Sequence, residues 1–428
     1  MNKNVFTNTV LESVQWFVWM LAGVVALPIV IGSMFQMNFA EIAGLMQRSL
    51  FVVGVASLLQ GLFGHRLPIM EGPAGIWISI FAIAAATAAQ SGITMEGSLQ
   101  KLEFMLIVSG LFLCLFGICK LAQKMLPIFT PVVTGTYFLL LTSQLSGTFL
   151  TGMLGLSGDE QTIQWTESAL AFLTFFLILG LSMFARGWLS HFAVFIGIAI
   201  GWIAYMICFG FPSTTKHTNF FSLPEIFAFG NPAMDMSVIP TAFITAILII
   251  SNLVAAIVSM NQVLGKTATN SGKQVNRGTV FAGINHGLSA LFSAIGNVSL
   301  AAASGFVSLT GQKRKQPFIY ASIAMIFVAF FPPIISFISS IPAPIANAAL
   351  MATFVQLVGI GIHNLAKEQL DSRKISIVGI SYLIGMGIMF LPLEAFQHLP
   401  SFIHPVMSNG LLVGTILVML LDQLWKDK

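Results

Sequence analysis

Residues 71–75 read EGPAG, and the apolar run IWISIFAIAAATAA follows directly at residues 76–89. Glycine and proline weaken a helix, so the backbone is expected to be interrupted where this run begins. A second run, AAASGFVS at residues 301–308, is apolar but too short to cross a bilayer as a straight helix, because a crossing needs about 20 residues. Interrupted backbone at membrane depth is tolerated only where it lines a cavity or is buried in protein, so both runs are expected to mark a functional site.

The composition of the chain is that of an integral membrane protein. Only 8% of the 428 residues are charged, against roughly 25% in a soluble domain, and 56% are hydrophobic. So few charges cannot cover a water-soluble fold of this size, which excludes a soluble enzyme, a nucleic-acid binder and a secreted disulfide scaffold. Cys114, Cys119 and Cys208 lie in apolar runs without metal-binding or disulfide spacing. No catalytic motif or cofactor loop is found, so neither an enzymatic activity nor a cofactor is expected.

Fourteen apolar segments are predicted to cross the membrane. They run from Val14 to Met34, Leu45 to Phe63, Pro73 to Ala89, Phe104 to Cys119, Ile128 to Leu145, Ala169 to Phe184, Phe192 to Cys208, Ile239 to Met260, Val280 to Ile295, Leu300 to Thr310, Phe318 to Ile338, Ile345 to Ile362, Ile375 to Phe390, and Gly410 to Leu424. With a cytoplasmic N-terminus, all but three of the 19 Lys and Arg residues fall on the cytoplasmic side. The exceptions, Arg48, Lys101 and Lys216, are placed in outside loops. By the positive-inside rule, this asymmetry predicts that both termini are cytoplasmic.

Fourteen spans divide into two halves of seven, and an odd-numbered half must repeat with inverted topology. The fifth and twelfth spans both follow a pair of prolines, at Pro127 and Pro131 and at Pro342 and Pro344. The third and tenth spans are both short or interrupted. Such segments at matching positions of two halves are typical of the substrate site of a secondary transporter. The alternative is that they are glycine-rich contacts between packed helices.

Glu71 lies against an interrupted span, whereas the other acidic residues are placed in loops, tails or span ends. A carboxylate inside a membrane is costly and is therefore a functional candidate by default. Glu71 would accept hydrogen bonds from a ligand or carry a coupling proton. The alternative is a carboxylate at a loop end that pairs with Arg66 or His65.

Asn252 is the most central amide of the eighth span, and its side chain can both donate and accept a hydrogen bond. Its alternative role is a hydrogen bond between helices. Gln15 and Trp16 in the first span are weaker candidates for ligand contact. Trp77 follows the interruption in the third span, where its ring would either stack on a flat ligand or serve in packing.

Several motifs, in order along nearly the whole chain, carry a resemblance to a known family. They are Gln15-Trp16 with Ala22 to Pro28, Gln60 to Gly64 leading into Leu67 to Gly72, Pro131 to Thr136, Val307 to Gly311, and Gly410 to Gly414. The set resembles the nucleobase–ascorbate transporters, which include uracil and xanthine permeases. The chain looks most similar to a divergent branch of purine-permease-like proteins with the same Met-Glu-Gly-Pro string.

The resemblance implies an all-α fold of seven plus seven inverted repeats, divided into a core domain and a gate domain. The core would hold residues 1–125 (spans one to four) and 238–340 (spans eight to eleven). The gate would hold residues 126–237 (spans five to seven) and 341–428 (spans twelve to fourteen). A nucleobase would lie between the third and tenth segments, the core would move against the gate, and proton symport is usual in bacterial members. The family often forms homodimers through its gate helices.

Together, the residue patterns and the resemblance indicate a substrate site. Its candidate residues are Gln15, Trp16, Glu71, Gly72, Ala74, Gly75, Trp77, Asn252, Ala301 and Ala302. The backbone donors of the family would lie near Gly75 and Ala301. Its binding Glu in the eighth span falls on Asn252, its Glu or Gln in the tenth falls on Ala302, and its first-span His falls on Trp16. The usual acidic pair is therefore absent, so the resemblance carries over neither proton coupling nor base specificity.

These observations predict a secondary active transporter in the cell membrane for a nucleobase such as uracil, xanthine or another purine. Its partners would be the lipid bilayer and a coupling proton or other cation, with no nucleic acid. One alternative has the same fold and carries another small solute or an anion. The carboxylate of Glu71 and the lack of a basic residue near the interrupted spans argue against an anion. Another alternative is a sensor or scaffold that has lost coupling, which the short loops and the lack of an appended domain disfavour.

Overall fold

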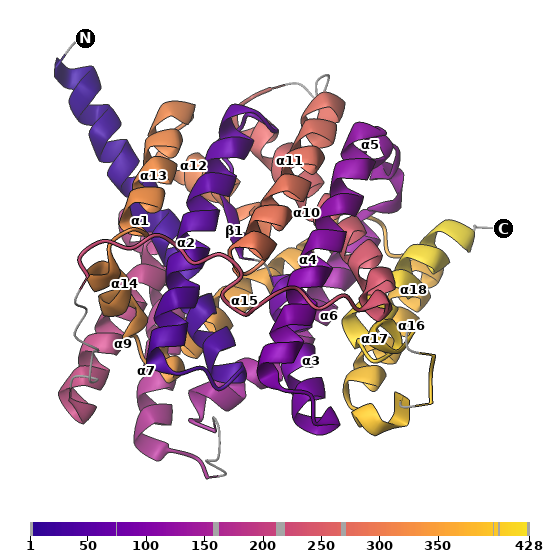
Figure 1. Ribbon diagram of the computed structural model, residues 1–428. Helices are drawn as coiled ribbons and strands as arrows, with labels where there is room; N and C mark the ends of the chain where they lie inside the picture. Colours follow the sequence, from indigo (N-terminus) through magenta and orange to yellow (C-terminus); the bar gives the residue numbers. More distant parts are fainter. Residues whose placement is uncertain are drawn as a thin grey trace.

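The computed structural model describes residues 3–73, 75–156, 162–210, 219–266, 271–396, 398–400 and 403–425. The described chain is mostly helical (Figure 1). Its longer helices are α1 (Lys3–Met34), α2 (Phe39–Leu62), α3 (Gly75–Ser91), α4 (Met95–Ile118), α6 (Pro131–Met153), α7 (Trp165–Phe184), α9 (Ala193–Phe209), α10 (Ile239–Val263), α11 (Ser271–Leu291), α12 (Ala302–Thr310), α13 (Lys315–Val328), α14 (Pro332–Ser339), α15 (Ala343–Ala366), α16 (Ser372–Met389) and α18 (Gly410–Leu424). Single-turn helices and 3₁₀ turns connect them: α5 (Leu121–Lys124), α8 (Trp188–His191), α17 (His404–Met407), Leu126–Ile128, Met236–Val238 and Leu393–Phe396.

Each of the fourteen predicted spans overlaps a helix of the described chain. The eleventh overlaps the pair α13 and α14, which is bent by 95°. By length and composition alone, six of the described helices can cross a membrane singly, or seven when the bent pair is taken as one crossing. Others are shorter, such as α12 with nine residues. The protein is therefore a helical, multi-pass membrane protein.

The boundaries of the predicted spans differ from the observed helices where polar residues begin a helix. α4 starts at Met95, well before the predicted Phe104, because Thr94 caps it by accepting a hydrogen bond from the N–H of Gly97. The placement of Arg48 and Lys101 in outside loops is wrong, since Arg48 lies within α2 and Lys101 within α4. A helix continues beyond the hydrocarbon layer, so charged residues near its end need not lie in a loop. Lys216 lies outside the described residues.

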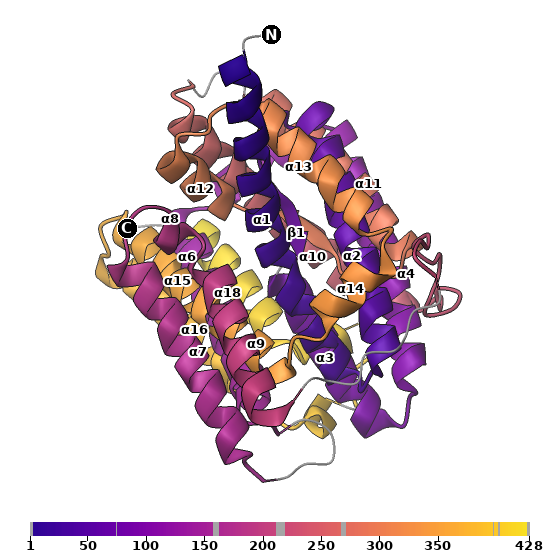
Figure 2. The same ribbon diagram turned by 90° about the vertical axis from the view of Figure 1, so that its left-hand side faces the viewer.

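The third and tenth segments each begin with a short strand that leads into a helix. β1 (Glu71–Pro73) pairs antiparallel with β2 (Asn297–Ser299), so that Glu71 lies opposite Ser299 and Pro73 opposite Asn297. α3 continues from β1 and α12 from β2, and Figures 1 and 2 show β1 among the helices in the middle of the molecule. Every residue of both strands is buried. The interruptions are therefore real, and the pairing of the two strands satisfies part of their backbone polar groups.

The helices of the two halves of the chain pack in matching pairs. α13 packs against α1 and α2, and α4 packs in the corresponding way against α10 and α11. Likewise α7 packs against α9, α16 packs against α18, and α6 lies along α15. Figure 2 shows α2, α4, α11, α13 and α14 on one side of the molecule and α7, α9, α15 and α16 on the other. The strand pair lies between these two groups.

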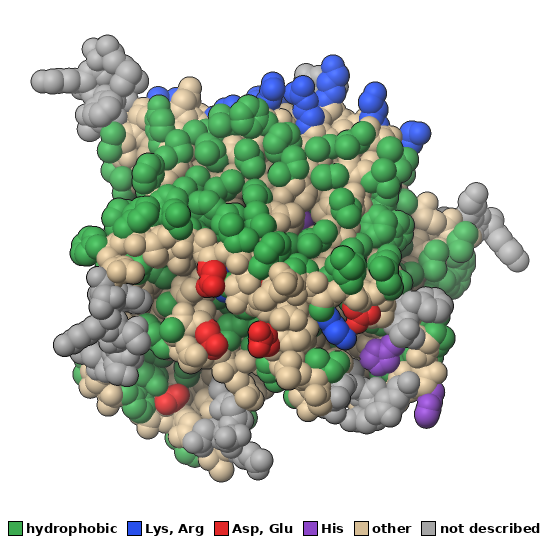
Figure 3. Space-filling model, in the orientation of Figure 1, with side chains coloured by type: hydrophobic (Ala, Val, Ile, Leu, Met, Phe, Trp, Pro, Cys, Tyr) green, Lys and Arg blue, Asp and Glu red, His purple; other side chains and the backbone are tan. Residues whose placement is uncertain are grey.

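The outer surface is apolar over a wide area. Large side chains of α7 and α9 face outward, including Phe176, Ile207 and Phe184, which is 82% exposed. Figure 3 shows Lys and Arg side chains gathered along the upper edge of the molecule, on the side of the N-terminus, with hydrophobic side chains below them. Exposed apolar area of this extent suits contact with lipid, with the basic side chains at one boundary of the apolar region.

Candidate functional site

Glu71 is fully buried at the start of β1, where groups from three other segments surround it. Its N–H donates to Ser57 Oγ of α2 over 3.0 Å. Ser299 Oγ of β2 donates a short hydrogen bond to Glu71 Oε1, and His65 Nε2 lies 3.6 Å from the same oxygen. The second carboxyl oxygen, Oε2, has no protein partner. Glu71 therefore lies against His65, as one of the two predictions for it states, and Arg66 is exposed.

His65 is held in one orientation by the turn that links α2 to β1. The N–H of Leu67 donates to His65 Nδ1 over 3.0 Å, and the Gln60 side chain accepts from the N–H of His65. Gln60 also donates to the carbonyl oxygen of Gly278 in α11 over 2.8 Å. Because a backbone N–H can only donate, Nδ1 must be an acceptor, so a neutral ring carries its proton on Nε2, the nitrogen that faces Glu71.

The glycines of the third segment permit close approach of neighbouring elements. A Cβ at Gly72 would lie 2.6 Å from Cδ1 of Leu300, so a side chain there would press on the residue that follows β2. A Cβ at Gly75 would lie 3.0 Å from Leu141 of α6 and 3.2 Å from Phe354 of α15. The first residue of α3 therefore faces α6 and α15. Ala74 lies outside the described residues.

The tenth segment presents an open face made of small residues. Ala301 precedes the first turn of α12, which begins at Ala302. Ala302, Gly305 and Ser308 are exposed and recur every three residues, so they share one side of the helix. On the buried side, Ser304 Oγ lies 2.6 Å from Ser259 Oγ of α10. The start of α12 is therefore accessible, with no large side chain covering it on this face.

Asn252 lies where α10 approaches α6. Its Nδ2 donates to the carbonyl oxygen of Leu248 over 3.1 Å, within the same helix, and its side chain interacts with that of Tyr137 on α6. Asn252 is half-buried, while Tyr137 is buried. α10 also contacts β2, so Asn252 is carried by a helix that borders the strand pair. The amide therefore has a partner on another helix, α6, and its role towards a ligand stays a prediction.

Comparison with known protein families assigns most of the chain. Residues 7–394 match the sequence model of a family described as the permease family. The protein belongs to this family. YwdJ of Bacillus subtilis (strain 168), named as a candidate purine permease, is 30% identical over 425 residues, which cover 98% of this chain and 97% of YwdJ. The xanthine permease and the uric acid permease PucJ of the same organism are 25% and 26% identical, and the matches cover 98% and 96% of this chain and 94% and 91% of the relatives.

Solved structures share the fold of this permease at low sequence identity. The transmembrane domain of the cyanobacterial bicarbonate transporter BicA aligns with a TM-score of 0.63 at 16% identity, covering 96% of this chain and 97% of that domain. SLC26A9 aligns with a TM-score of 0.65 at 12% identity, covering 96% of this chain and 65% of the other. These similarities show that the chain shares the fold of these domains.

Trp77 of the permease is fully buried and bonded inside the protein. Its Nε1–H donates to His286 Nε2 of α11 over 3.1 Å, and His286 Nδ1 in turn donates to the carbonyl oxygen of Ala282 over 2.7 Å. Both ring nitrogens of His286 are thus occupied, which makes it a neutral packing residue. The geometry favours the packing alternative for Trp77 over stacking on a ligand.

Trp16 and Gln15 lie beside α12 rather than at the strand pair. Trp16 is fully buried, and its ring packs 4.6 Å from that of Phe306 in α12 and 5.2 Å from that of Phe318 in α13. Gln15 accepts a short hydrogen bond from the side chain of Gln312, just after α12. Both residues therefore support the back and the end of the tenth segment.

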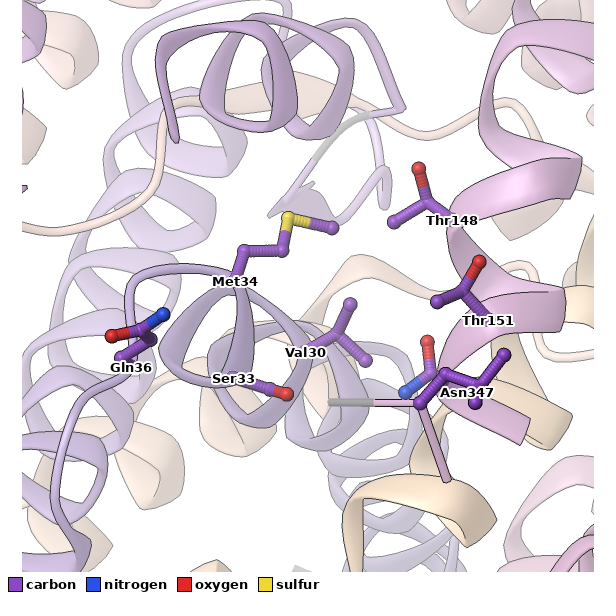
Figure 4. A pocket seen from close by; sticks show the side chains of 9 residues that line it. Val30, Ser33, Met34, Gln36, Thr148, Thr151 and Asn347 are labelled. Atoms are coloured by element: carbon purple, nitrogen blue, oxygen red, sulfur yellow. The ribbon is translucent and has the colours of Figure 1, made fainter. Parts of the chain in front are cut away.

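Two cavities are found among the described residues of the permease. One cavity, of about 340 Å³, is bounded by the end of α1, the end of α6 and the start of α15. Figure 4 shows Val30 and Met34 facing Thr148 and Thr151, with Asn347 beside them. The other, of about 460 Å³, lies beside α3, α4, the start of α10 and residues 399–409. None of the predicted site residues that the structure describes lines either cavity.

The larger cavity contains an ion pair that the sequence analysis did not identify. Lys101 of α4 and Asp235, just before α10, approach to 2.9 Å, and both line the cavity next to Ile80 and Thr87 of α3. Burial opposes ionisation of Asp235, but hydrogen bonds from Ser237 and Lys101 outweigh it and lower the pKa of Asp235. The expectation that no basic residue lies near the interrupted spans is therefore wrong, because Lys101 borders α3.

A second buried carboxylate lies on α4. Glu103 accepts a short hydrogen bond from Ser293 Oγ, and Arg48 Nε donates to the carbonyl oxygen of Ser293 over 3.3 Å. The guanidinium of Arg48 also lies 5.2 Å from the ring centre of Phe229. The placement of every acid except Glu71 in loops, tails or span ends is therefore wrong for Glu103, which lies inside α4. The predicted span begins at Phe104, so Glu103 is interpreted from the sequence as a residue at the end of the span, whereas α4 begins at Met95.

Proposed function

We propose that this permease is a secondary active transporter that carries a nucleobase, such as uracil, xanthine or another purine, across the cell membrane. The observation that carries the proposal is the antiparallel pairing of β1 with β2, which joins the segment just before α3 to the segment just before α12. Free backbone N–H groups at helix starts are donors for carbonyl oxygens. A nucleobase presents carbonyl oxygens and ring N–H groups on a flat edge. The names of the relatives, which specify purine, xanthine and uric acid, support this class of substrate.

The proposal includes a detailed architecture. Fourteen spans form seven plus seven inverted repeats, with a core of residues 1–125 and 238–340 and a gate of residues 126–237 and 341–428. The matching helix contacts in the two halves and the separation into two helix groups support this division. Both termini are cytoplasmic, which the basic side chains along the N-terminal edge support. A homodimer through the gate helices rests on the family resemblance.

The substrate would lie between the two interrupted segments. The backbone around Gly72 and Gly75 and that of Ala301 and Ala302 would donate to carbonyl oxygens, and the amide of Asn252 would read a second polar edge. The small residues on the open face of α12 leave room for a flat ring. Glu71 would carry the coupling proton, because it is the buried carboxylate on the strand pair.

An anion carrier is the second candidate. It is favoured by the fold shared with the bicarbonate transporter BicA and by Lys101, whose ammonium borders the larger cavity beside α3. It is disfavoured by Glu71 at the strand pair and by Asp235, which already neutralises Lys101 at 2.9 Å.

Uptake by proteoliposomes separates these functions. Radiolabelled uracil, xanthine, hypoxanthine, uric acid and bicarbonate are offered to the purified protein, with and without an inward pH gradient. We expect saturable uptake of at least one nucleobase, accelerated by the gradient, and none of bicarbonate. Failure to bind or take up any purine or pyrimidine refutes the proposal. Bicarbonate uptake that is lost in Lys101→Gln identifies an anion carrier, and binding of a nucleobase without flux identifies a sensor.

A further inference from the structure

The pair of His65 and Glu71 is a buried titratable unit that no aqueous surface reaches directly. Both side chains are fully buried, and Nε2 of His65 lies 3.6 Å from Oε1 of Glu71. Among the described residues, no Lys or Arg lies within ion-pair distance of Glu71. The charge of Glu71 must therefore be balanced by His65 or removed by a proton.

The remaining charged and titratable groups on the elements around the strand pair are engaged elsewhere or exposed. Three of these groups have other partners: Glu12 of α1 pairs with Arg314 at 2.9 Å, Glu41 caps α2, and Arg48 of α2 donates to the carbonyl oxygen of Ser293. On α11, His286 accepts a hydrogen bond from Trp77. The remaining basic residues, Lys273 and Arg277 of α11 and Arg66 next to the pair, are exposed. β2, α3 and α10 carry no charged residue in their described parts. His65 is therefore the single titratable partner of Glu71 among the described residues.

The hydrogen bonds decide where the proton of the pair resides. Nδ1 of His65 accepts from the N–H of Leu67, so protonating that nitrogen would break a backbone bond. A neutral His65 carries its proton on Nε2, towards Glu71. Burying a carboxylate without a cationic partner is costly, and Oε2 of Glu71 has no protein partner, so the additional proton is assigned to Glu71. In this state the pair is neutral, with a carboxylic acid beside a neutral imidazole.

We propose that His65 and Glu71 together form the proton-binding site of this permease, in which Glu71 carries the proton and His65 is the positioning residue that stabilises the carboxylate after release. This inference rests on the proposed transport function. On release, the O–H bond of Glu71 breaks, the electron pair stays on the carboxylate and the proton passes to water. His65 Nε2–H then donates to that carboxylate, and a hydrogen bond to a charged acceptor is roughly twice as strong as a neutral one.

The strand pair connects the proton to the substrate position. Glu71 Oε1 accepts from Ser299, the residue of β2 directly opposite it, and the N–H of Leu300 donates to the carbonyl oxygen of Met70 over 2.9 Å. The next residue, Ala301, leads into α12. A change of charge on Glu71 therefore acts on β2 three residues before the start of the helix where the nucleobase would be held. Proton and substrate share one rigid element of two strands.

The position of His65 also defines a route for the proton. Arg66, the next residue, is exposed and has a positive φ of 61°, so the turn between α2 and β1 reaches the surface there. In the proposed topology this surface is cytoplasmic. His65 therefore lies one residue from an exposed position, on the side where the proposal has the proton released.

Glu71→Gln, His65→Gln and the exposed control Arg66→Gln test the assignment in proteoliposomes. In Glu71→Gln we expect accumulation driven by a pH gradient to be lost, and any remaining nucleobase uptake to be independent of pH. In His65→Gln we expect accumulation to remain with an altered pH profile, because the carboxylate loses the imidazole that lies against it. Arg66→Gln should behave like the parent. Gradient-driven accumulation by Glu71→Gln, or an unchanged pH profile in His65→Gln, overturns the proposal.

A spectroscopic measurement keeps the test independent of the substrate. Infrared difference spectra between acid and alkaline buffer should show a carboxylic-acid carbonyl band that is absent in Glu71→Gln and shifted in His65→Gln. If the parent binds no nucleobase yet shows this band, the proposed function fails and the proton site stands. If the band persists in Glu71→Gln, the proton site fails. Thermal unfolding of each purified variant identifies any variant that does not fold. If Glu71→Gln or His65→Gln does not fold, the infrared measurement is made on Glu71→Asp instead. We expect the carboxylic-acid band of Glu71→Asp to be shifted, and an unchanged band refutes the site.

Discussion

The close contact between α4 and α11 yields a prediction whose size follows from the structure. Gly110 of α4 and Gly283 of α11 place their backbones against each other. A Cβ at Gly283 would lie 2.5 Å from the carbonyl oxygen of Gly110 and 2.7 Å from the backbone nitrogen of Cys114. Carbon–oxygen contacts normally lie at about 3.3 to 3.6 Å, so Gly283→Ala must push the helices about 1 Å apart. Overpacking of this kind typically costs about 1 to 3 kcal/mol.

Gly287, one turn later on α11, provides the matched control. A Cβ there would have no neighbour within 4 Å. Both substitutions gain the same helix propensity, about 1 kcal/mol, so the difference between the two variants isolates the contact with α4. We expect the apparent Tm of detergent-purified Gly283→Ala to lie several degrees below that of Gly287→Ala, which should match or exceed the parent. An equal Tm for both variants, or a lower one for Gly287→Ala, would refute the argument from backbone contact.

Three further predictions address the site and its surroundings. Asn252→Ala should weaken nucleobase binding about tenfold in equilibrium binding assays, because it removes an amide worth about 1.4 kcal/mol of hydrogen bonding; unchanged affinity would exclude Asn252 from the site. Trp77→Phe should lower the free energy of unfolding by about 1 to 3 kcal/mol in thermal unfolding, because it leaves Nε2 of His286 buried without a donor. Uptake by the folded fraction should stay normal. Lost uptake with parental stability would instead indicate that Trp77 stacks on the ligand. Asp235→Asn should cost less than about 1 kcal/mol at pH 7, since the pair with Lys101 is partly exposed. Because the folded pKa of Asp235 is lowered, its stabilisation is present at neutral pH and disappears as the pH falls through that pKa, so parent and variant should converge in acid.

The helical segments were predictable because their signal is local. Runs of apolar residues long enough for a bilayer identify segments that fold as helices wherever they lie, and each predicted span overlaps a helix. The interruption before α3 was predictable for the same reason, since Gly72 and Pro73 act on the adjacent backbone. Boundaries were less predictable. Lys101 and Glu103 indicate the end of an apolar run, but α4 continues through both, because a helix tolerates charged residues wherever neighbouring groups or water satisfy them.

The environment of Glu71 was only partly predictable. The sequence contains His65 six positions earlier, which suggested pairing, but Arg66 was an equally near candidate. The hydrogen bond from Leu67 to His65 Nδ1 and the exposure of Arg66 distinguish the two. The bond from Ser299 to Glu71 links residues 228 positions apart, and no local pattern reports a contact at that separation.

By itself, the sequence determined that this protein is a multi-pass helical membrane protein, where its helices lie, and that two of its segments are interrupted, because apolar runs, prolines and glycines act on their own neighbourhood. It also carried the family membership, through motifs spread along the chain. Only the tertiary structure decided that the two interruptions meet as β1 and β2, that Trp77 is bonded to His286 rather than free, and that Glu71 is enclosed with His65 and Ser299. These facts depend on which distant segments pack together, and packing is a property of the whole chain rather than of any local stretch.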